Sequence, residues 1–113
     1  MNLMPKQTNS LLCHLEDLPD PGSKGFQVSG RAVFAVRHGQ RVFVYENRCP
    51  HRGIPLEWVP DQFLDSSGQL IQCASHGALF LPESGECVAG PCAGAHLKPV
   101  ASHQDNEGRV WLD

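Results

Sequence analysis

The sequence predicts an all-β fold, an antiparallel sandwich or barrel built from short strands. Three observations favour this class. Apolar residues recur in short runs rich in β-branched and aromatic side chains, with turn residues between the runs. The chain holds 11 Gly and 9 Pro residues, a composition typical of folds with many tight turns. No stretch keeps a helical period of 3.6 residues for any sustained length, so a helical architecture is disfavoured.

The N-terminal part of the chain is expected to form an edge strand and a hairpin. Residues 11–16 (LLCHLE) give the edge strand, which ends before a turn rich in proline. Residues 31–37 and 40–46 give the two arms of the hairpin, because both are rich in Val, Phe and other strand formers. His38 and Gly39 form the turn between them, where glycine accepts the positive φ of a tight hairpin. We expect His38 to be a solvated turn residue.

The C-terminal part is expected to form shorter strands. A strand at residues 68–72 leads into Cys73, and a strand at residues 78–81 follows a few positions later. Residues 97–101 and 109–112 form a last antiparallel pair around a polar turn (DNEG).

Length and charge limit the possible functions. The 113 residues are enough for one domain with a modest core, which we expect to span residues 1–113. The formal net charge of −3 leaves no basic footprint for nucleic acid. No apolar run approaches the roughly 18 residues of a membrane span. Residues 1–10 have neither a signal-peptide pattern nor a twin-arginine pair. We therefore expect a cytoplasmic protein that binds neither nucleic acid nor membrane.

Two short segments each carry one cysteine and one histidine followed by a glycine. They are residues 49–53 (CPHRG) and residues 73–77 (CASHG). One such pair would be weak evidence, because most buried Cys and His residues simply pack in a core. A second pair with a matching glycine is much stronger. Two thiolates and two imidazoles can hold either a tetrahedral zinc ion or a [2Fe–2S] cluster. The candidate ligands are Cys49, His51, Cys73 and His76.

The residues around these pairs resemble the two cluster loops of Rieske iron–sulfur proteins. The matching segments are residues 47–53 (NRCPHRG) and 73–80 (CASHGALF). Residues 84–91 (SGECVAGP) resemble the turn and proline loop that close over the cluster in that family. The resemblance extends from about Arg31 to the C-terminus. It implies three small antiparallel sheets, with a cluster-binding subdomain at one end whose loops lie within about residues 47–92.

The resemblance also implies one [2Fe–2S] cluster per chain and a role for each ligand. Cys49 and Cys73 would bind one iron as thiolates, and His51 and His76 would bind the other as neutral imidazoles. Imidazoles place less negative charge on their iron, which raises the potential to a range of about −150 to +300 mV. The glycine after each pair lets the backbone turn tightly and bring amide groups towards the sulfur atoms.

Four positions depart from the pattern of respiratory Rieske proteins. Those proteins carry an extra cysteine in each loop, joined as a disulfide, whereas this chain has Ile54 and Ser75 there. They also place a serine and a tyrosine where this chain has Ala78 and Phe80, which donate no hydroxyl hydrogen bond. Fewer hydrogen bonds to sulfur leave the reduced cluster less stabilised. We therefore expect a low-potential centre of the ferredoxin or oxygenase type.

The segment between the two pairs, residues 52–72, is longer than we expect for Rieske ferredoxins. The surplus falls at residues 58–65 (WVPDQFLD), which are unusually apolar for a loop. One reading is that Trp58, Phe63 and Leu64 form a small satellite core under the cluster. The other is that part of this loop is exposed beside the cluster and helps to dock a partner.

Three further cysteines lie outside the two pairs. Cys13 stands in an apolar stretch and is expected to fill the core. Cys87 and Cys92 flank the turn at residues 90–91. They are either small buried residues or residues that tune the cluster.

The resemblance implies an electron-transfer protein with no substrate site of its own. We expect a soluble one-electron carrier that accepts electrons from a reductase and passes them to an oxygenase or another oxidoreductase. The chain is too short for the catalytic iron domain of a ring-hydroxylating oxygenase subunit. A small Rieske subunit of a larger oxidoreductase, of the nitrite-reductase type, is the alternative. A structural zinc module is a third possibility.

Overall fold

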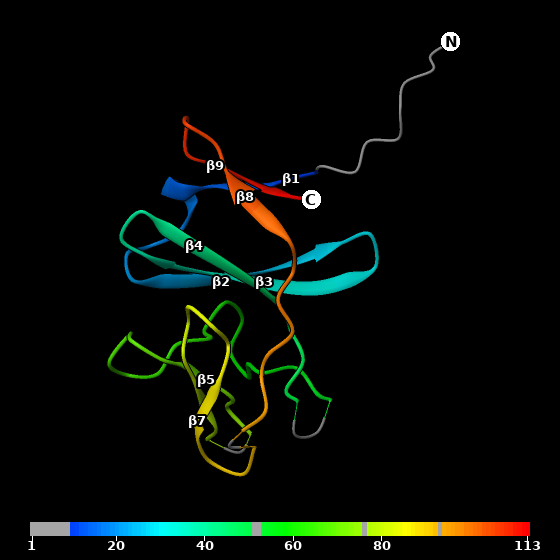
Figure 1. The fold of residues 1–113 in the computed structure, drawn as a ribbon, viewed down its shortest axis with the longest axis vertical. Helices are drawn as coiled ribbons and strands as arrows, with labels where there is room; N and C mark the ends of the chain where they lie inside the picture. Colours follow the sequence, from blue (N-terminus) through cyan, green and yellow to red (C-terminus); the bar gives the residue numbers. More distant parts are fainter. Residues whose placement is uncertain (1–9, 51–52, 76, 93) are drawn as a thin grey trace.

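The computed structural model describes residues 10–50, 53–75, 77–92 and 94–113. These residues form three antiparallel sheets of three strands each, placed one after another along the molecule (Figure 1). The prediction of an antiparallel all-β fold is confirmed. Among the described residues, no helix has the length and apolar character needed to cross a membrane.

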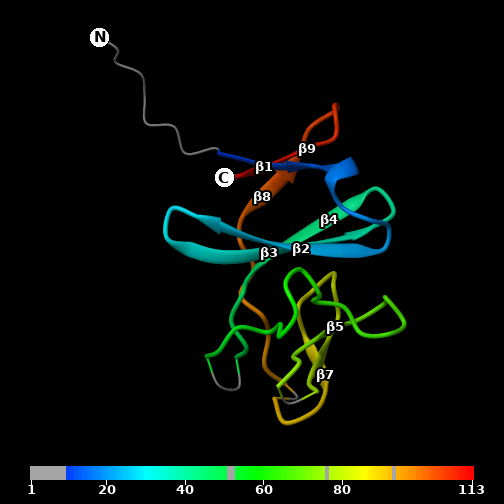
Figure 2. The ribbon, with the colours of Figure 1, turned by 180° about the vertical axis from the view of Figure 1, so that it is seen from behind.

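Each sheet is built from a different part of the chain. The first, with strand order β1-β9-β8, consists of β1 (Ser10–His14), β9 (Arg109–Leu112) and β8 (Ser102–Gln104). The second, with order β2-β3-β4, consists of β2 (Gly22–Val28), β3 (Arg31–His38) and β4 (Arg41–Glu46). The third, with order β5-β6-β7, consists of β5 (Ile71–Gln72), β6 (Leu79–Phe80) and β7 (Cys87–Ala89). A 3-10 helix, η1 (Leu15–Asp17), follows β1. Seen from behind, the second sheet lies between the other two (Figure 2).

Strand β3 supplies side chains to both hydrophobic cores of the molecule. Phe34 and Val36 pack in the core shared with the third sheet. Val33 and Ala35 pack in the core shared with the first sheet. Successive side chains of a strand point to opposite faces, so a strand covered on both faces reads as a continuous apolar run. This explains the uninterrupted AVFAV segment of β3.

The hairpin of β3 and β4 confirms the prediction from sequence, with one correction at its turn. Strand β3 pairs with β4 up to His38 opposite Arg41, and Gly39 in the turn has a φ of 64°. His38 belongs to the strand and is half-buried. Its Nε2 lies 2.9 Å from the carbonyl oxygen of Gly68. The expectation of a solvated His38 is therefore wrong.

Other boundaries also differ from those expected. The sequence does not predict strand β2, because its two glycines lower the strand propensity of this segment. The strand nevertheless pairs with β3 along its whole length. The expected strand at residues 97–101 is reduced to one bridge between Pro99 and Tyr45. The partner of β9 on that side is β8, a few residues later in the chain. Proline lacks the N–H that a continuing ladder requires, which explains the displacement.

Candidate metal centre

Two loops beside the third sheet share one backbone pattern. The N–H of Cys49 donates to the carbonyl of the residue five positions later at 2.7 Å, and the N–H of Gly53 donates back to the Cys49 carbonyl at 2.7 Å. The loop at Cys73 repeats both bonds, at 2.9 Å for Cys73 and 2.8 Å for Gly77. The two glycines have φ values of 73° and 70°, a region that costs other residues more. Each cysteine therefore begins an equivalent tight turn that ends at a glycine.

The glycine amides in these turns form hydrogen bonds to the backbone of the same turn. The N–H groups of Gly53 and Gly77 donate to cysteine carbonyl oxygens. These two amides are therefore engaged within the turns, and the approach of other amide groups of the loops to the sulfur atoms remains a prediction. The glycines are needed for their positive φ, which shapes the loop that holds each cysteine.

The two loops are joined through Leu56 and Asn47. The N–H of Ala74, in the second loop, donates to the carbonyl of Leu56 at 2.8 Å. The N–H of Leu56 donates to Oδ1 of Asn47 at 2.9 Å, and Nδ2 of Asn47 donates to Oε1 of Glu57 at 2.9 Å. Leu56 is fully buried, so these bonds fix the loops from inside. Analysis of the sequence did not assign this bracing role to Asn47, although it lies directly before the Arg48–Cys49 pair.

Both cysteines of the candidate site are completely shielded from solvent. Cys49 and Cys73 are 0% exposed and belong to one hydrophobic core with Phe34, Phe63 and Phe80. An uncompensated thiolate in such surroundings would be costly, whereas a metal ion compensates its charge. Two buried thiols in equivalent loops therefore fit the cysteine half of a [2Fe–2S] site.

The histidine half of the candidate site lies outside the described residues. His51 and His76 fall in the segments that the structure does not describe. In the described part of the chain, no three Cys, His, Asp or Glu side chains come together as a metal site. A complete set of four ligands, with Cys49 and Cys73 as two of them, therefore remains a prediction from the sequence.

A third loop packs against the second one. Gly90 has a φ of 99°, and a Cβ placed on it would lie 2.7 Å from the Cα of Ala78. Only glycine fits at this point, because the neighbouring atom belongs to the backbone. The carbonyls of Cys87 and Cys92 accept hydrogen bonds from the N–H groups of Gly94 (3.3 Å) and Ala95 (2.9 Å). Both cysteines are thus held in place beside the two cysteine loops.

Cys87 and Cys92 are buried thiols in contact with each other. The Sγ of Cys92 lies 3.2 Å from the Sγ of Cys87, and the Sγ of Cys87 donates to the carbonyl of Ala89 at 3.2 Å. Burial raises the pKa of Cys92 to about 12, and its hydrogen bond to Cys87 acts in the same direction. Cys13 lies in the other core, as expected, and burial raises its pKa to about 11.

Each of the two interpretations of the loop at residues 58–65 holds for one part of the loop. Phe63 is fully buried and stacks on Phe34 with ring centroids 4.3 Å apart. Leu64 is half-buried against the same core. Trp58 is 73% exposed, and its Nε1 donates to Oγ of Ser75 at 3.0 Å. One end of the loop therefore forms a satellite core, whereas the other presents an apolar ring beside the second cysteine loop.

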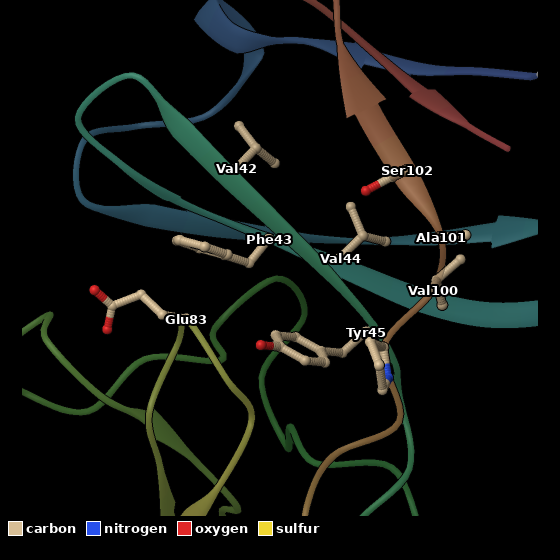
Figure 3. Close-up of a pocket in the computed structure, with 9 residues that line it drawn as sticks. Val42, Phe43, Val44, Tyr45, Glu83, Val100, Ala101 and Ser102 are labelled. Atoms are coloured by element: carbon tan, nitrogen blue, oxygen red, sulfur yellow. The ribbon is translucent and has the colours of Figure 1, made fainter.

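One open groove lies apart from these loops. It has a volume of about 340 Å³ and runs between β4 and the segment at residues 99–102 (Figure 3). Tyr45 lines it and donates its hydroxyl to the carbonyl of Pro82 at 2.6 Å. Glu83 stands at its edge. None of the described residues of the two cysteine loops lines this groove.

Comparison with known proteins agrees with this geometry. A family model described as the Rieske [2Fe–2S] domain matches residues 8–104. The chain is 32% identical over 109 residues to the chloroplastic Protein TIC 55 of Arabidopsis thaliana, covering 86% of this chain and 18% of that protein. It is 31% identical over 77 residues to the ferredoxin component of the alkene monooxygenase system of Xanthobacter autotrophicus, covering 68% of this chain and 60% of that protein. The chain thus spans less than two thirds of each of these relatives.

Solved structures show the same fold. The ferredoxin of carbazole 1,9a-dioxygenase from Nocardioides aromaticivorans IC177 matches with a TM-score of 0.75 and 23% identity, covering 94% of this chain and 97% of that one. The terminal oxygenase of carbazole 1,9a-dioxygenase from Novosphingobium sp. KA1 matches with a TM-score of 0.76 and 23% identity, covering 92% of this chain and 29% of that one.

Proposed function

This chain belongs to the Rieske [2Fe–2S] domain family, and from that premise we propose that it is a one-electron carrier for an oxygenase system. Its cofactor is a Rieske-type [2Fe–2S] cluster. The observation that carries the proposal is the pair of equivalent loops, each of which begins at a fully buried cysteine and closes on a glycine.

We propose Cys49, His51, Cys73 and His76 as the four ligands. When bound, the cluster supplies a centre that gains and loses one electron at a time. The residues around it exclude water from Cys49 and Cys73 and hold both thiols in an apolar core. Leu56 accepts a hydrogen bond from the second cysteine loop and donates one to Asn47. These bonds hold the two cysteine loops in a fixed position relative to each other. Rigid support of this kind suits a centre whose geometry must change little between its redox states.

The relatives support a carrier. The fold match covers 97% of a dioxygenase ferredoxin. Another solved structure is the reduced complex between oxygenase and ferredoxin in carbazole 1,9a-dioxygenase. We infer that this chain likewise delivers electrons to an oxygenase and receives them from a reductase. We further propose that the exposed Trp58 and Val59 border the face on which these partners dock.

The proposal is tested with the purified holoprotein. We expect two iron atoms and two acid-labile sulfides per chain, and reductive titration under argon should take up one electron per chain. With a flavin-dependent ferredoxin reductase and NADH, the protein should carry electrons to cytochrome c. A zinc-containing protein, or a cluster that the reductase does not reduce, would contradict the proposal. Gel filtration with co-purified proteins separates a free carrier from a subunit of a larger oxidoreductase.

Replacement of the ligands tests the site itself. Cys49→Ala, His51→Ala, Cys73→Ala and His76→Ala should each abolish the visible absorption of the cluster. Cys13→Ala is the matched control, because it removes a buried thiol from the other core. If Cys13→Ala loses the cluster while His51→Ala keeps it, the ligand assignment is wrong.

A further inference from the structure

A surface pocket with a volume of about 200 Å³ lies directly beside the first cysteine loop. Two of its residues, Asn47 and Arg48, immediately precede Cys49 in the chain. The start of β3 and the end of β4 supply the rest of the lining, which consists of Arg31, Ala32, Glu46, Asn47 and Arg48. The pocket is therefore a polar feature of the surface, at the point where the chain leaves the second sheet for the cysteine loop.

One carboxylate in this pocket is shared by two cations. Oε2 of Glu46 lies 3.2 Å from Nη2 of Arg31 and 3.8 Å from Nζ of Lys98. The side chains of Arg31 and Lys98 are 52% and 76% exposed, whereas that of Glu46 is 24% exposed. The carboxylate is thus largely withdrawn from solvent, and both cations are presented to it.

The guanidinium of Arg48 lies over the turn that begins at Cys49. Its Nη2 and Nε would lie 3.1 Å and 3.2 Å from a Cβ placed on Gly53, the glycine that closes this turn. Arg48 is exposed, and no carboxylate in the described part of the chain forms an ion pair with it. Arg48 therefore presents a positive charge directly beside the first cysteine loop.

The cationic patch formed in this way consists of Arg31, Arg48 and Lys98. Two carboxylates adjoin it, namely Glu46 and Glu57, and Oε1 of Glu57 accepts a hydrogen bond from Nδ2 of Asn47 at 2.9 Å. Three positive charges against two negative ones leave a positive local balance, whereas the whole chain has a formal net charge of −3. A local charge opposite in sign to that of the rest of the protein attracts and orients a negatively charged partner.

We propose that the cationic patch docks a carboxylate-rich surface of a redox partner beside the first cysteine loop. The inference rests on the proposed function, because it takes this loop as one of the two that hold the cluster. Charges at the rim of an interface mainly steer the encounter and fix the orientation of the partner. The exposed Trp58, which bonds to Ser75 in the second cysteine loop, supplies apolar contact area instead. The two features thus adjoin different loops and have different roles.

The test measures the local charge at this loop with two small oxidants. Ferricyanide is a trianion and hexaammineruthenium(III) is a trication, and each takes one electron from the reduced holoprotein. Their rate constants are measured by stopped flow at low ionic strength for wild type, Arg48→Gln, Arg48→Glu and Arg48→Lys. Arg41→Gln is the matched control, because it also removes one exposed arginine, which pairs with Glu83 and stands at the other end of β4. A change in midpoint moves both rate constants in the same direction, whereas a change in local charge moves them in opposite directions.

We expect the ratio of the ferricyanide rate constant to the ruthenium rate constant to fall about tenfold in Arg48→Gln, since both Coulomb effects act on this ratio at low ionic strength. The ratio should fall further in Arg48→Glu and keep its wild-type value in Arg48→Lys and Arg41→Gln. Arg31→Gln and Lys98→Gln should lower it by smaller factors, and they test the patch even where Arg48→Gln holds less iron. These differences should disappear in roughly 1 M salt, where the screening length is about 3 Å.

A binding measurement that does not depend on electron transfer tests the chemistry of the partner. A dye-labelled oligoglutamate peptide represents the carboxylate-rich surface, and fluorescence anisotropy at low ionic strength reports its binding to the oxidised holoprotein. We expect wild type to bind this peptide and Arg48→Glu to bind it about tenfold more weakly, because one attraction becomes a repulsion. Arg48→Lys and Arg41→Gln should bind it as wild type does.

Several outcomes overturn the inference while the proposed function stands. Iron and sulfide content and one-electron reduction test that function, whereas the rate ratio and the peptide affinity of the loaded variants test the cationic patch. An unchanged ratio in Arg48→Gln and Arg48→Glu, or an equal fall in Arg41→Gln, contradicts the patch. Equal peptide binding by wild type and Arg48→Glu does so too. Phosphate that displaces the peptide far better than chloride at equal ionic strength makes the patch a site for small anions, which contradicts the docking role.

Discussion

At the scale of single residues, the site depends on a few glycines as much as on its cysteines. Gly53 and Gly77 close the two cysteine turns with positive φ, and the sequence shows both because each follows a Cys–His pair. Gly90 has a different constraint, since it touches the backbone of Ala78. That contact joins segments that are distant in the strand pattern, so it could not be inferred from local spacing.

Replacement of Gly90 measures this contact. Gly90→Ala should destabilise the holoprotein by about 1–2 kcal/mol from its positive φ and by a further roughly 1–3 kcal/mol from overlap with Ala78. Gly94→Ala is the matched control, because Gly94 has a φ of 94° and nothing within 4 Å of an added Cβ. Urea unfolding followed by circular dichroism gives both free energies of unfolding. Equal losses in the two variants would show that Gly90 does not pack on Ala78.

At the scale of elements, the loop at residues 58–65 illustrates what composition can and cannot determine. Its apolar content indicated either a satellite core or an exposed surface, and the loop does both. Phe63 stacks on Phe34 of β3, whereas Trp58 remains on the surface and bonds to Ser75. The sequence carries no period in this stretch, so burial could not be assigned residue by residue. The tertiary contact with β3 determines which residues of this loop are buried.

Two substitutions in this loop should separate packing from docking. Phe63→Ala should lower the free energy of unfolding by about 3–5 kcal/mol, as is usual for a buried phenylalanine. Trp58→Ala should change it by only about 0.5 kcal/mol, because the ring is mostly exposed. The Trp58→Ala substitution should instead slow the reduction of the cluster by the reductase and leave the midpoint potential unchanged. A Trp58→Ala protein with wild-type electron-transfer rates would exclude this ring from the docking face.

The turn between β8 and β9 is fixed by one carboxylate. Oδ2 of Asp105 accepts hydrogen bonds from Nε1 of Trp111 (3.0 Å) and Nε of Arg109 (2.6 Å). Its Oδ1 accepts the N–H groups of Glu107 (2.9 Å) and Arg109 (2.9 Å). These bonds, that from Trp111 first, hold the pKa of Asp105 well below its usual range. The sequence predicted a polar turn here but not this set of contacts.

This lowered pKa gives a pH dependence with a definite sign. The ionised form is favoured in the folded state, so its stabilisation is fully present above the ordinary Asp pKa of about 3.9. It is lost as the pH falls further, towards the lowered pKa of the folded state. Asp105→Asn should therefore melt at a lower temperature than wild type at pH 7, and the gap should narrow below about pH 4. A gap that is constant from pH 7 to pH 3 would contradict the assignment.

At the scale of the whole molecule, the sequence was sufficient for the fold class and for singling out the two loops that hold buried Cys49 and Cys73. The β3–β4 hairpin follows from residues with strong strand preferences, and the edge strand β1 from a short apolar run. Strand β2 and the displaced strand β8 could not be predicted in this way. Glycine and proline weaken the local strand pattern there, and the pairing with β3 and β9 is seen only in the assembled sheets. The two Cys–His segments were evident from their repetition. The close approach of Gly90 to Ala78 depends on the third loop folding back, which no local pattern reveals.

The central claim is that two cysteines and two histidines of this chain hold a [2Fe–2S] cluster. Its most direct test is electron–nuclear double resonance on the reduced holoprotein, prepared once with ordinary histidine and once with histidine labelled with nitrogen-15. The account predicts strong coupling from two histidine nitrogens, and the loss of cluster signal in both His51→Ala and His76→Ala. A reduced cluster with no coupled histidine nitrogen, held by sulfur alone, would contradict it.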